Sequence, residues 1–449
     1  MYITEIELTN LRSFKGTHKV SLAHDDGSYA GWTVFAGRNG SGKSSLLKAI
    51  ALGVIGPLAS RSLAGVFTGW VNAGERAGTV VIRIKTSTRD EFGVGVTPPT
   101  ESFAVGLKWT SAQFGTWINQ SSDLLDRWVD QETPATKLLA DAGPWRDNAK
   151  GWFLAGYGPY RHLGPPPAEI EKFKGVPVLA RLVNLFNETA TLSDAVDWLQ
   201  QIHVRSLEKR DGADELKRTV LAILGDGLLP DGSKIIDVDS TGLRIERDGV
   251  ILSLEGVSDG YRTVAALVVD ILMRLYQTYR TLDVSQDANG KTICHLPGIV
   301  MIDEVDAHMH VAWQQQIGFW LTRTFPAIQF LVTTHSPFIC QAASPGAIFR
   351  LPGIGDSRKI EAISHSAWAA VVNGGADDAV MTDLFGLEHA HSQHAEDLRQ
   401  ELAGLEVKVL QDTATTIELD RYDDLKVLLG DDIGAAADRK LRAISGRHG

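Results

Sequence analysis

Cysteine is scarce in this sequence. Only Cys294 and Cys340 occur among 449 residues, each beside apolar sequence, so we expect buried free thiols rather than a disulfide framework. No apolar run is long enough to span a membrane, because "AALVVDILMRL" is interrupted by Asp270 and Arg274. The initial "MYITEIELTN" lacks the basic region of a secretory signal. These absences predict a soluble cytoplasmic protein that makes no membrane contact.

The chain also lacks an excess of basic residues and any repetitive sequence. The net charge of −11 argues against a protein that coats nucleic acid non-specifically, although it leaves room for a local basic groove. The chain has no low-complexity tract and no heptad run long enough for an extended coiled-coil arm. With 44% hydrophobic and 22% charged residues, it has a globular composition and is long enough for two or three lobes.

The strongest motif is a glycine-rich loop between a predicted strand and a predicted helix. Residues 37–44 read "GRNGSGKS" and satisfy the P-loop pattern G-x-x-x-x-G-K-[ST]. The preceding "GWTVFAG" suits a buried strand, and the following "SSLLKAIAL" has apolar residues at helical spacing. Because the N–H groups of such a loop surround phosphate oxygens, Lys43 is expected to reach the β- and γ-phosphates and Ser44 to bind Mg²⁺. A glycine-rich surface turn is the alternative.

A second motif, "VMIDEVDAHMH" from Val300 to His310, allows two interpretations by itself. Aspartate and histidine bind transition metals, whereas paired carboxylates hold Mg²⁺ or activate water. Residues 298–302 form a continuous apolar run, so Asp303 and Glu304 are predicted to emerge at the end of a buried strand. Nucleotide hydrolysis beside a P-loop requires carboxylates at such a position. The P-loop therefore favours a nucleotide site over a metallohydrolase centre.

Two further segments can complete a nucleotide site. The run "IQFLVTTHSPF", residues 328–338, is predicted as the next buried strand, with two threonines and His335 near its end. A helix predicted from Arg262 follows "VSDG", whose serine either caps the helix or forms an anion site with the first N–H groups. Beside a P-loop, we interpret His335 as a γ-phosphate contact or switch.

In this order, the motifs "LRSF", "GRNGSGKSS", "VSDGYRT", "IVMIDEVD" and "FLVTTHSPF" resemble those of an ABC-type ATPase of the SMC/RecF/OLD branch. The chain is similar in particular to stand-alone AAA-type ATPases of bacterial anti-phage defence systems, of the PtuA and AriA type. The resemblance covers residues 1–55 and 230–352. It implies an α/β fold, in which an ABC-ATPase head combines a mixed, largely parallel P-loop sheet with an antiparallel β lobe.

The resemblance implies ATP and Mg²⁺ as cofactors and a catalytic role for Glu304, Asp303, His335 and Lys43. Glu304 would be the general base for water, and His335 would be the switch histidine. Lys43 would bind the phosphates. Ser44 would coordinate Mg²⁺, and Asp303 would support the metal.

Further nucleotide contacts follow from the same resemblance. Arg12, Ser13 and Phe14 would lie near the adenine or its ribose and phosphates, and Asp306 would lie at a dimer seam. The P-loop contacts would be Gly37, Arg38, Asn39, Gly40, Ser41, Gly42, Lys43, Ser44 and Ser45. The signature residues would be Ser258, Asp259 and Gly260, which would touch the γ-phosphate of ATP held by a second copy of the chain.

Three features depart from the family pattern. The signature reads "VSDGYR" instead of "LSGGQ", and Val311 follows "HMH" where relatives commonly have proline. No Q-loop glutamine is recognisable. The segment "FLAGYGPYRHLG" occupies the corresponding place, so either Arg161 serves there or the segment is a plain turn.

Four parts are predicted along the chain. The segments "TVVIRIKT" and "SFAVGLKW" alternate like antiparallel strands, residues 177–210 have helical spacing, and "LRIERDGVILSLE" reads as a hairpin turning at Asp248–Gly249. The parts are an N-terminal lobe with the P-loop, 1–160; a helical insertion, 161–232; a C-terminal lobe with the signature, "MIDE" and His335, 233–352; and a helical C-terminal extension, 353–449.

The C-terminal extension has two possible roles. An apolar stripe at Leu398, Leu402, Leu405 and Val409 predicts a short helical hairpin that packs against the head or docks a partner or second copy. The run "EHAHSQH", residues 388–394, is a conceivable metal cluster but lacks a cysteine or a well-spaced carboxylate. No Toprim-like acidic constellation is visible, so a built-in nuclease is not expected.

The resemblance leads to one favoured function. The chain would be a dimerising ATPase that acts as the sensor or regulatory subunit of an anti-phage complex and controls a partner effector such as an HNH or Toprim nuclease. The alternative is a DNA-repair or maintenance ATPase of RecF/SMC type that acts on DNA directly. A transporter subunit is disfavoured by "RSF", the long insertion and "TTHSPF".

Overall fold

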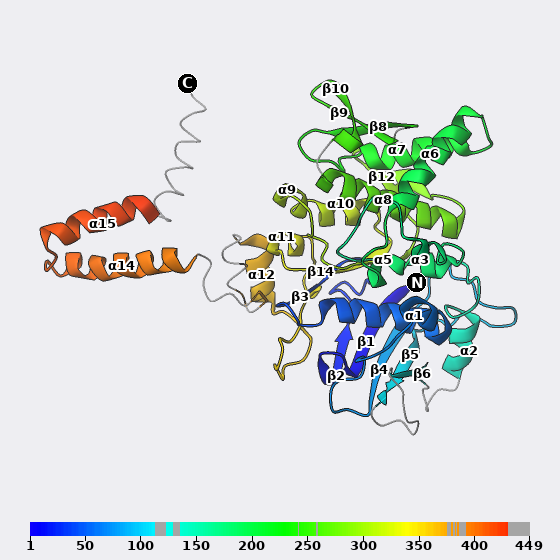
Figure 1. The fold of residues 1–449 in the computed structure, drawn as a ribbon, viewed down its shortest axis with the longest axis horizontal. Helices are drawn as coiled ribbons and strands as arrows, with labels where there is room; N and C mark the ends of the chain where they lie inside the picture. Colours follow the sequence, from blue (N-terminus) through cyan, green and yellow to red (C-terminus); the bar gives the residue numbers. More distant parts are fainter. Residues whose placement is uncertain are drawn as a thin grey trace. The chain divides into compact units, whose positions relative to one another are not determined.

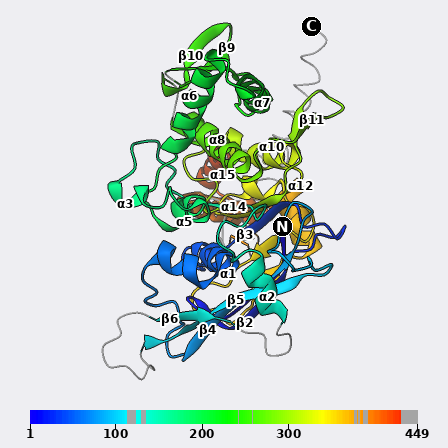
Figure 2. The same cartoon turned by 90° about the vertical axis from the view of Figure 1, so that its right-hand side faces the viewer.

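The computed structural model describes residues 1–112, 123–128, 135–240, 242–256, 259–374, 379, 382, 384–385 and 392–429. The chain divides into two compact units, Met1–Gly386 and Leu387–Gly449. Figures 1 and 2 show the first unit as a layered α/β fold with α1 between two sheets. The finer division predicted at residues 160, 232 and 352 stays a prediction.

A six-stranded sheet forms the centre of the first unit. Its strand order is β16-β15-β3-β14-β13-β7, and all neighbours from β15 to β7 run parallel. The strands are β3 (Gly31–Ala36), β7 (Leu154–Tyr157), β13 (Gly298–Ile302), β14 (Ile328–Thr334), β15 (Ile348–Arg350) and β16 (Glu361–Ala362). The predicted strands before the P-loop and before Asp303 are both confirmed and run parallel, but they are not direct neighbours as expected, because β14 lies between them.

Burial on both faces explains why β13 is apolar throughout. Ile299 and Met301 pack with the core on the α1 side, whereas Val300 and Ile302 pack with the core around α8 (Asp259–Tyr279). Parallel strands covered on both faces read as continuous apolar runs, as this one does.

An antiparallel sheet covers the other side of α1 (Lys43–Ala64), which contacts β4 and β5 of this sheet and β14 of the central one. The strand order is β2-β1-β4-β5-β6. Its strands are β1 (Tyr2–Leu11), β2 (Phe14–Ser21), β4 (Ala77–Lys85), β5 (Phe103–Thr110) and β6 (Leu124–Arg127). The predicted antiparallel β lobe is confirmed, because "TVVIRIKT" and "SFAVGLKW" pair as β4 and β5.

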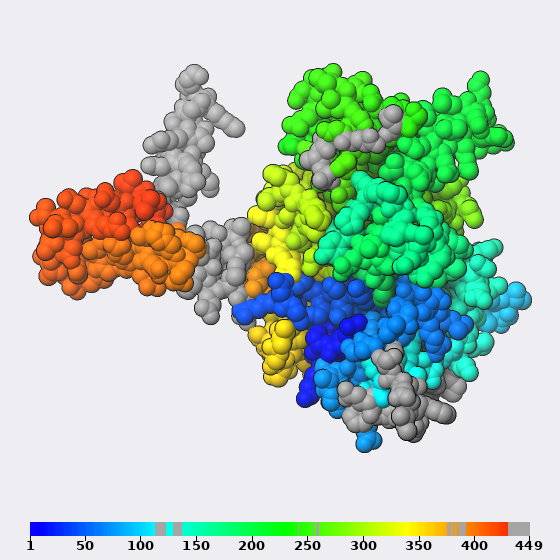
Figure 3. All heavy atoms as spheres, viewed as in Figure 1, coloured from blue at the N-terminus to red at the C-terminus, as the bar shows by residue number. Residues whose placement is uncertain are grey.

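The helix α1 is apolar and long. By length and composition alone it could cross a membrane, but 67% of its most apolar window is buried inside the fold. Figure 3 shows the segment from α3 to α5 packed directly on this helix. Burial between two sheets accounts for its apolar composition.

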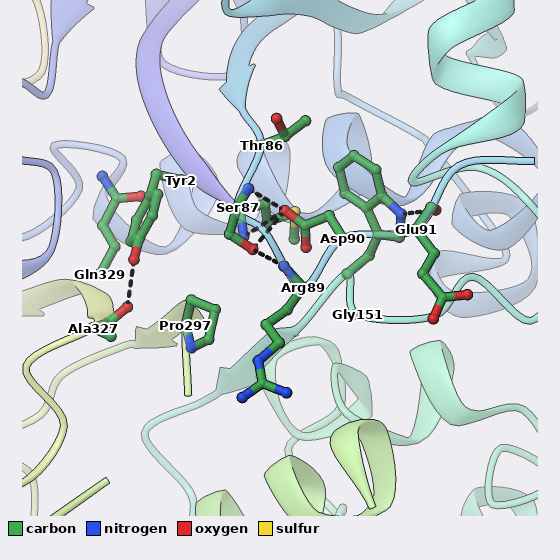
Figure 4. Close-up of polar contacts among 12 residues, drawn as sticks. Tyr2, Thr86, Ser87, Arg89, Asp90, Glu91, Gly151, Pro297, Ala327 and Gln329 are labelled. Carbon is green, nitrogen blue, oxygen red and sulfur yellow. Dashed lines mark hydrogen bonds and ion pairs between the residues drawn. The ribbon is translucent and has the colours of Figure 1, made fainter. Parts of the chain in front are cut away.

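One buried side chain joins the two sheets. Gln329 on β14 is fully buried, accepts a hydrogen bond from the N–H of Ile3 at 2.7 Å and donates one to the carbonyl of Ile3 at 2.8 Å. The neighbouring Tyr2 hydroxyl donates to the carbonyl of Ala327 at 3.0 Å, as Figure 4 shows. These contacts tie the first strand of the antiparallel sheet to β14, the strand that precedes His335.

Further helices pack beyond α8, on the side of the central sheet away from α1, and a small sheet packs on these helices. The remaining helices of this unit are α2 (Ala135–Ala142), α3 (Ala168–Glu171), α4 (Pro177–Ala180), α5 (Val183–Phe186), α6 (Ser193–Leu207), α7 (Ala213–Gly225), α9 (Val311–Gln314), α10 (Ile317–Thr324), α11 (Pro337–Cys340) and α12 (His365–Asn373). Two small sheets contain β8 (Lys234–Asp239), β9 (Gly242–Arg247), β10 (Val250–Ser253), β11 (Val284–Gln286) and β12 (Thr292–Cys294), and η2 (Leu254–Gly256) follows β10.

The helical segment predicted over 177–210 and the hairpin predicted over 243–255 are both present. Residues 177–210 contain three helices, with breaks at 181–182 and 187–192. The hairpin of β9 and β10 turns at Asp248 and Gly249, whose φ angles of 51° and 77° match a two-residue turn of the I′ type.

The second unit is a helical hairpin of α14 (Gln393–Leu410) and α15 (Thr416–Leu429), as predicted. The Arg421 guanidinium and the Glu401 carboxylate join the helices by hydrogen bonds of 2.8 and 2.9 Å. His389 and His391 of the conceivable metal cluster lie outside the described residues. Among the residues that the structure describes, no group of three metal-ligating side chains occurs.

Candidate functional site

The P-loop connects β3 to the start of α1. Gly40 and Gly42 have φ angles of 78° and 90°, and Gly42 immediately precedes the first turn of the helix. A Cβ atom on Gly42 would lie 2.3 Å from Oγ of Ser13 and 2.9 Å from the ring of Phe14. Glycine is therefore required here both by the left-handed backbone and by the close approach of the segment after β1.

Lys43 lies beneath this loop. Its Nζ donates hydrogen bonds to the carbonyls of Gly37 at 2.9 Å and Arg38 at 3.2 Å, and the side chain is 6% exposed. Burial lowers the pKa of Lys43, and the nearby carboxylates of Glu304 and Asp303 oppose that shift. The ammonium group is thus held next to the N-terminus of α1, where the loop and helix favour an anion.

The carboxylates after β13 are positioned by β14. The hydroxyl of Thr333 donates to Oδ1 of Asp303 at 2.5 Å and accepts the N–H of Glu304 at 2.7 Å. Asp303 is 2% exposed, whereas Glu304 lines a cavity and has a left-handed φ of 45°. The two adjacent carboxylates therefore face different surroundings, one buried at the strand end and one directed to open space.

The segment after β14 differs from the predicted strand. The strand ends at Thr334, because the hydroxyl of Ser336 accepts the N–H of Phe338 and Pro337 begins α11. His335 lies in the connection and lines the same cavity as Glu304. Burial lowers its pKa, and the charge of Lys43 adds to the effect, so the neutral imidazole is favoured.

A cavity of about 360 Å³ brings most of the predicted residues together. Its lining residues are Arg12, Ser13, Asn39, Gly40, Gly42, Lys43, Ser44, Ser45, Gly69, Glu304 and His335. Sequence reasoning missed Gly69, which has no motif of its own. The guanidinium of Arg12 lies over the ring of the adjacent Trp70 at 4.6 Å, which orients it at the edge of the site.

Other predicted residues lie outside the cavity lining. Phe14 is 1% exposed and packs in the core beneath Gly42, so its ring supports the loop from below. The lining does not include Gly37, Arg38, Ser41 or Asp303, of which Gly37, Ser41 and Asp303 are buried.

The signature segment is only partly described. Ser258 lies outside the described residues, and so does the side chain of Asp259. A Cβ on Gly260 would lie 2.9 Å from the carbonyl of His308, so the start of α8 packs closely on the segment after Glu304. Within the described chain, no residue of α8 lines the cavity.

The two histidines of "DAHMH", His308 and His310, are not among the described residues that line the cavity. His310 precedes α9, and its Nδ1 accepts the N–H of Ala312 at 3.3 Å, as a helix cap does. His308 is exposed. Arg161, the candidate for the Q-loop position, contacts backbone carbonyls near Glu304 and is not among the described residues that line the cavity.

The donor atoms suit Mg²⁺. Ser44 lines the cavity, Asp303 lies at the adjacent strand end, and hydroxyl and carboxylate oxygens are the ligands this ion prefers. The buried hydroxyl of Ser41 has no hydrogen-bond partner among the described residues, which also fits a loop that receives polar ligand atoms.

The P-loop at the end of β3 and the carboxylate pair at the end of β13, which is separated from β3 by β14 in the same parallel sheet, define an ABC-type ATPase head. The antiparallel lobe over α1 completes this fold. Residues 33–341 match the family described as "AAA domain, putative AbiEii toxin, Type IV TA system". The chain belongs to this family.

Individual relatives are similar over different lengths. The chain is 26% identical over 348 residues to the Septu protein PtuA of Bacillus mycoides, which is 77% of this chain and 40% of the relative. It is 40% identical over 109 residues to the "Retron Ec83 probable ATPase" of Escherichia coli, 24% of this chain and 19% of the relative. The chain thus spans less than half the length of each of these relatives.

Two solved structures also align with most of this chain. An Smc head bound to the C-winged helix domain of ScpA has a TM-score of 0.46 and 18% identity, over 82% of this chain and 99% of that one. The SMC head domain from Thermotoga maritima has a TM-score of 0.42 and 14% identity, over 81% and 100%.

Proposed function

We propose that this protein binds ATP with Mg²⁺ and hydrolyses it to ADP and phosphate. The observation that carries the proposal is the single cavity shared by the P-loop, Glu304 and His335. Three segments far apart in the sequence supply an anion-binding loop, a carboxylate and a neutral imidazole at the positions that hydrolysis of a phosphoanhydride requires.

Each side chain has a chemical task in this proposal. The loop N–H groups and the Lys43 ammonium bind the phosphates. Glu304 accepts a proton from the attacking water, and His335 as a neutral ring donates a hydrogen bond from its single N–H to the γ-phosphate. Ser44 would hold Mg²⁺ and Asp303 would support it; when bound, that ion neutralises charge on the β- and γ-phosphates.

We further propose that two copies enclose two ATP molecules. The described part of α8 contributes nothing to the cavity in its own chain, which supports a site completed by Ser258 and Gly260 of a second copy. ATP would then supply contacts that exist only in the closed dimer, and hydrolysis would remove them.

The cellular role proposed is control of an effector in anti-phage defence. The motifs resemble those of defence ATPases, and the relatives named above are a Septu protein and a retron ATPase. The effector would be a separate protein, such as an HNH or Toprim nuclease. Direct action on DNA is the second candidate, and stimulation of ATP hydrolysis by DNA ends in the absence of any partner would favour it.

The test of the hydrolytic proposal compares two variants with two controls. Lys43→Ala should weaken binding of a fluorescent ATP analogue, whereas Glu304→Gln should bind the analogue normally and lose roughly 10²–10⁴-fold in hydrolysis rate. Lys234→Ala and Glu246→Gln alter exposed residues of β8 and β9 and should change neither. Undiminished hydrolysis by Glu304→Gln would refute its role as the general base.

A further inference from the structure

Arg161 contacts the backbone next to the catalytic carboxylates. It follows β7 and is 3% exposed. Its guanidinium nitrogens donate hydrogen bonds to the carbonyl oxygens of Gly158 (3.0 Å), Asp303 (3.2 Å), Glu304 (3.2 Å), Val305 (3.4 Å) and Ala307 (3.1 Å). Four of these five acceptors belong to one turn, residues 303–307.

The N–H groups of the same turn are held by the flanking strands. The N–H of Asp303 donates to the carbonyl of Tyr157 on β7 at 2.8 Å. The N–H groups of Glu304 and Val305 donate to the hydroxyl and the carbonyl of Thr333 on β14, at 2.7 and 3.0 Å. The flanking strands thus accept hydrogen bonds from the N–H groups of residues 303–305, and Arg161 donates hydrogen bonds to the carbonyls of the same turn.

The conformation of this turn needs external support. Glu304 has a φ of 45°, in the left-handed region that non-glycine residues rarely adopt. Successive carbonyls that converge on one point also repel one another, and a cation at that point offsets the repulsion. Burial lowers the pKa of Arg161 to about 10, so the guanidinium still carries its charge at neutral pH.

The segment that carries Arg161 is itself fixed by a buried asparagine. The side chain of Asn184 accepts the N–H of Gly158 at 2.9 Å and donates to the carbonyls of Tyr160 at 3.2 Å and Ala190 at 3.0 Å. Asn184 therefore fixes the backbone just before Arg161, on the side of the turn away from β14.

We propose that Arg161 is a positioning residue for hydrolysis, whose guanidinium fixes the turn 303–307 so that the Glu304 carboxylate stays directed into the cavity. This inference rests on the proposed ATPase function. Because Arg161 is not among the described residues that line the cavity, its removal should act on Glu304 and spare nucleotide binding.

Three variants test the proposal through steady-state kinetics. Arg161→Met removes the cation at similar size, and Arg161→Lys keeps a charge with fewer donors. The matched control is Arg181→Met, because Arg181 also donates to a carbonyl of β7, that of Leu154 at 3.1 Å, but at the opposite end of the strand. Burial lowers the pKa of Arg181 to about 10 as well.

The expected result separates catalysis from binding and stability. Arg161→Met should lower kcat at least about tenfold with the affinity for a fluorescent ATP analogue within about twofold, and Arg161→Lys should recover part of kcat. Arg181→Met should lower the melting temperature by about as much as Arg161→Met does, but it should leave kcat unchanged. Equal losses of kcat in Arg161→Met and Arg181→Met would overturn the proposal, since they would reveal only a general loss of stability.

Amide hydrogen exchange decides the question independently of activity. In Arg161→Met without nucleotide, the amides of residues 304–307 should exchange faster than in the wild type, and Arg181→Met should leave them unchanged. Unaltered exchange of these amides in Arg161→Met refutes the positioning role even if the wild type hydrolyses ATP. A wild type without ATPase activity refutes the proposed function, while exchange still decides the role of Arg161 in the turn.

Discussion

The hydroxyl of Thr333 donates to Asp303 and accepts the backbone N–H of Glu304, so one side chain on β14 sets the position of both carboxylates. A threonine hydroxyl has one donor and two acceptor sites, and this arrangement uses the donor and one acceptor. Because β13 and β14 are paired, this hydroxyl holds Asp303 and Glu304 at fixed positions relative to β14. The central strand therefore contributes to the site through a residue that no nucleotide needs to touch.

Thr333→Val tests this placement. The substitution preserves shape but removes the partners of the buried Oδ1 of Asp303 and the partly buried N–H of Glu304, which costs about 1–3 kcal/mol in the free energy of unfolding. Urea unfolding should show this loss, and the hydrolysis rate should fall as well. Thr333→Ser keeps the hydroxyl and should retain most of the rate; a Val variant as active as the Ser variant would contradict the assignment.

Gly42→Ala should abolish nucleotide binding. The left-handed backbone costs alanine about 1–2 kcal/mol, and the added Cβ would also lie 2.3 Å from Oγ of Ser13. The comparison is Gly27→Ala, where φ is +77° and no atom lies within 4 Å of the added Cβ. Titration with a fluorescent ATP analogue should separate the two variants, and equal binding by both would show that the contact with Ser13 is unimportant.

Glu304→Gln with ATP should accumulate dimers. If closure requires ATP and opening requires hydrolysis, blocking hydrolysis leaves the closed state populated. Sedimentation velocity with and without ATP measures the effect, and adding Ser258→Arg to the same chain should return it to monomers. A chain carrying both substitutions that still dimerises with ATP would argue against a signature contact between copies.

The free energy of unfolding should depend on pH partly through the protonation of His335. Its pKa is lowered in the folded protein by burial and by the charge of Lys43, so the unfolded chain takes up a proton first as pH falls through 6.5. The free energy of unfolding should therefore be largest above pH 6.5 and decrease below it. His18 and His24 act in the same direction because burial lowers their pKa values too.

The contribution of His335 to this pH dependence is the difference between the wild type and a variant without the imidazole. Urea unfolding of His335→Asn and wild type at pH 7.5 and 5.5 should show a smaller loss on acidification in the variant. Identical losses in the two proteins would mean that His335 titrates as it does in the unfolded chain.

The local elements of the site can be predicted from the sequence because each has its own pattern. The apolar run before Asp303 predicts a strand over residues 298–302, and the structure has the same bounds. The strand predicted over 328–338 is too long, since apolar Phe338 continues the pattern after Ser336 and Pro337 have started a helix.

The supporting contacts could not be predicted in the same way. Arg161 binds backbone carbonyls, which leave no trace in residue type, and Thr333 is one of two adjacent threonines with equal claim to the role. Gln329 appears in the sequence as a polar interruption of an apolar run, and only its pairing with Ile3 explains it. These contacts join segments distant in sequence and depend on the tertiary fold.

The strand order has a consequence for synthesis of the chain. β14 lies between β3 and β13, so the P-loop strand and the strand of Asp303 have no direct hydrogen bonds to each other. While the ribosome adds about 5–20 residues per second, the P-loop must wait many seconds for residues 328–334 before its sheet can close. A nascent or truncated chain that stops earlier also lacks β15, so it leaves both edges of β3 and one edge of β13 open to chaperones or to aggregation, and it has no assembled nucleotide site to stabilise it.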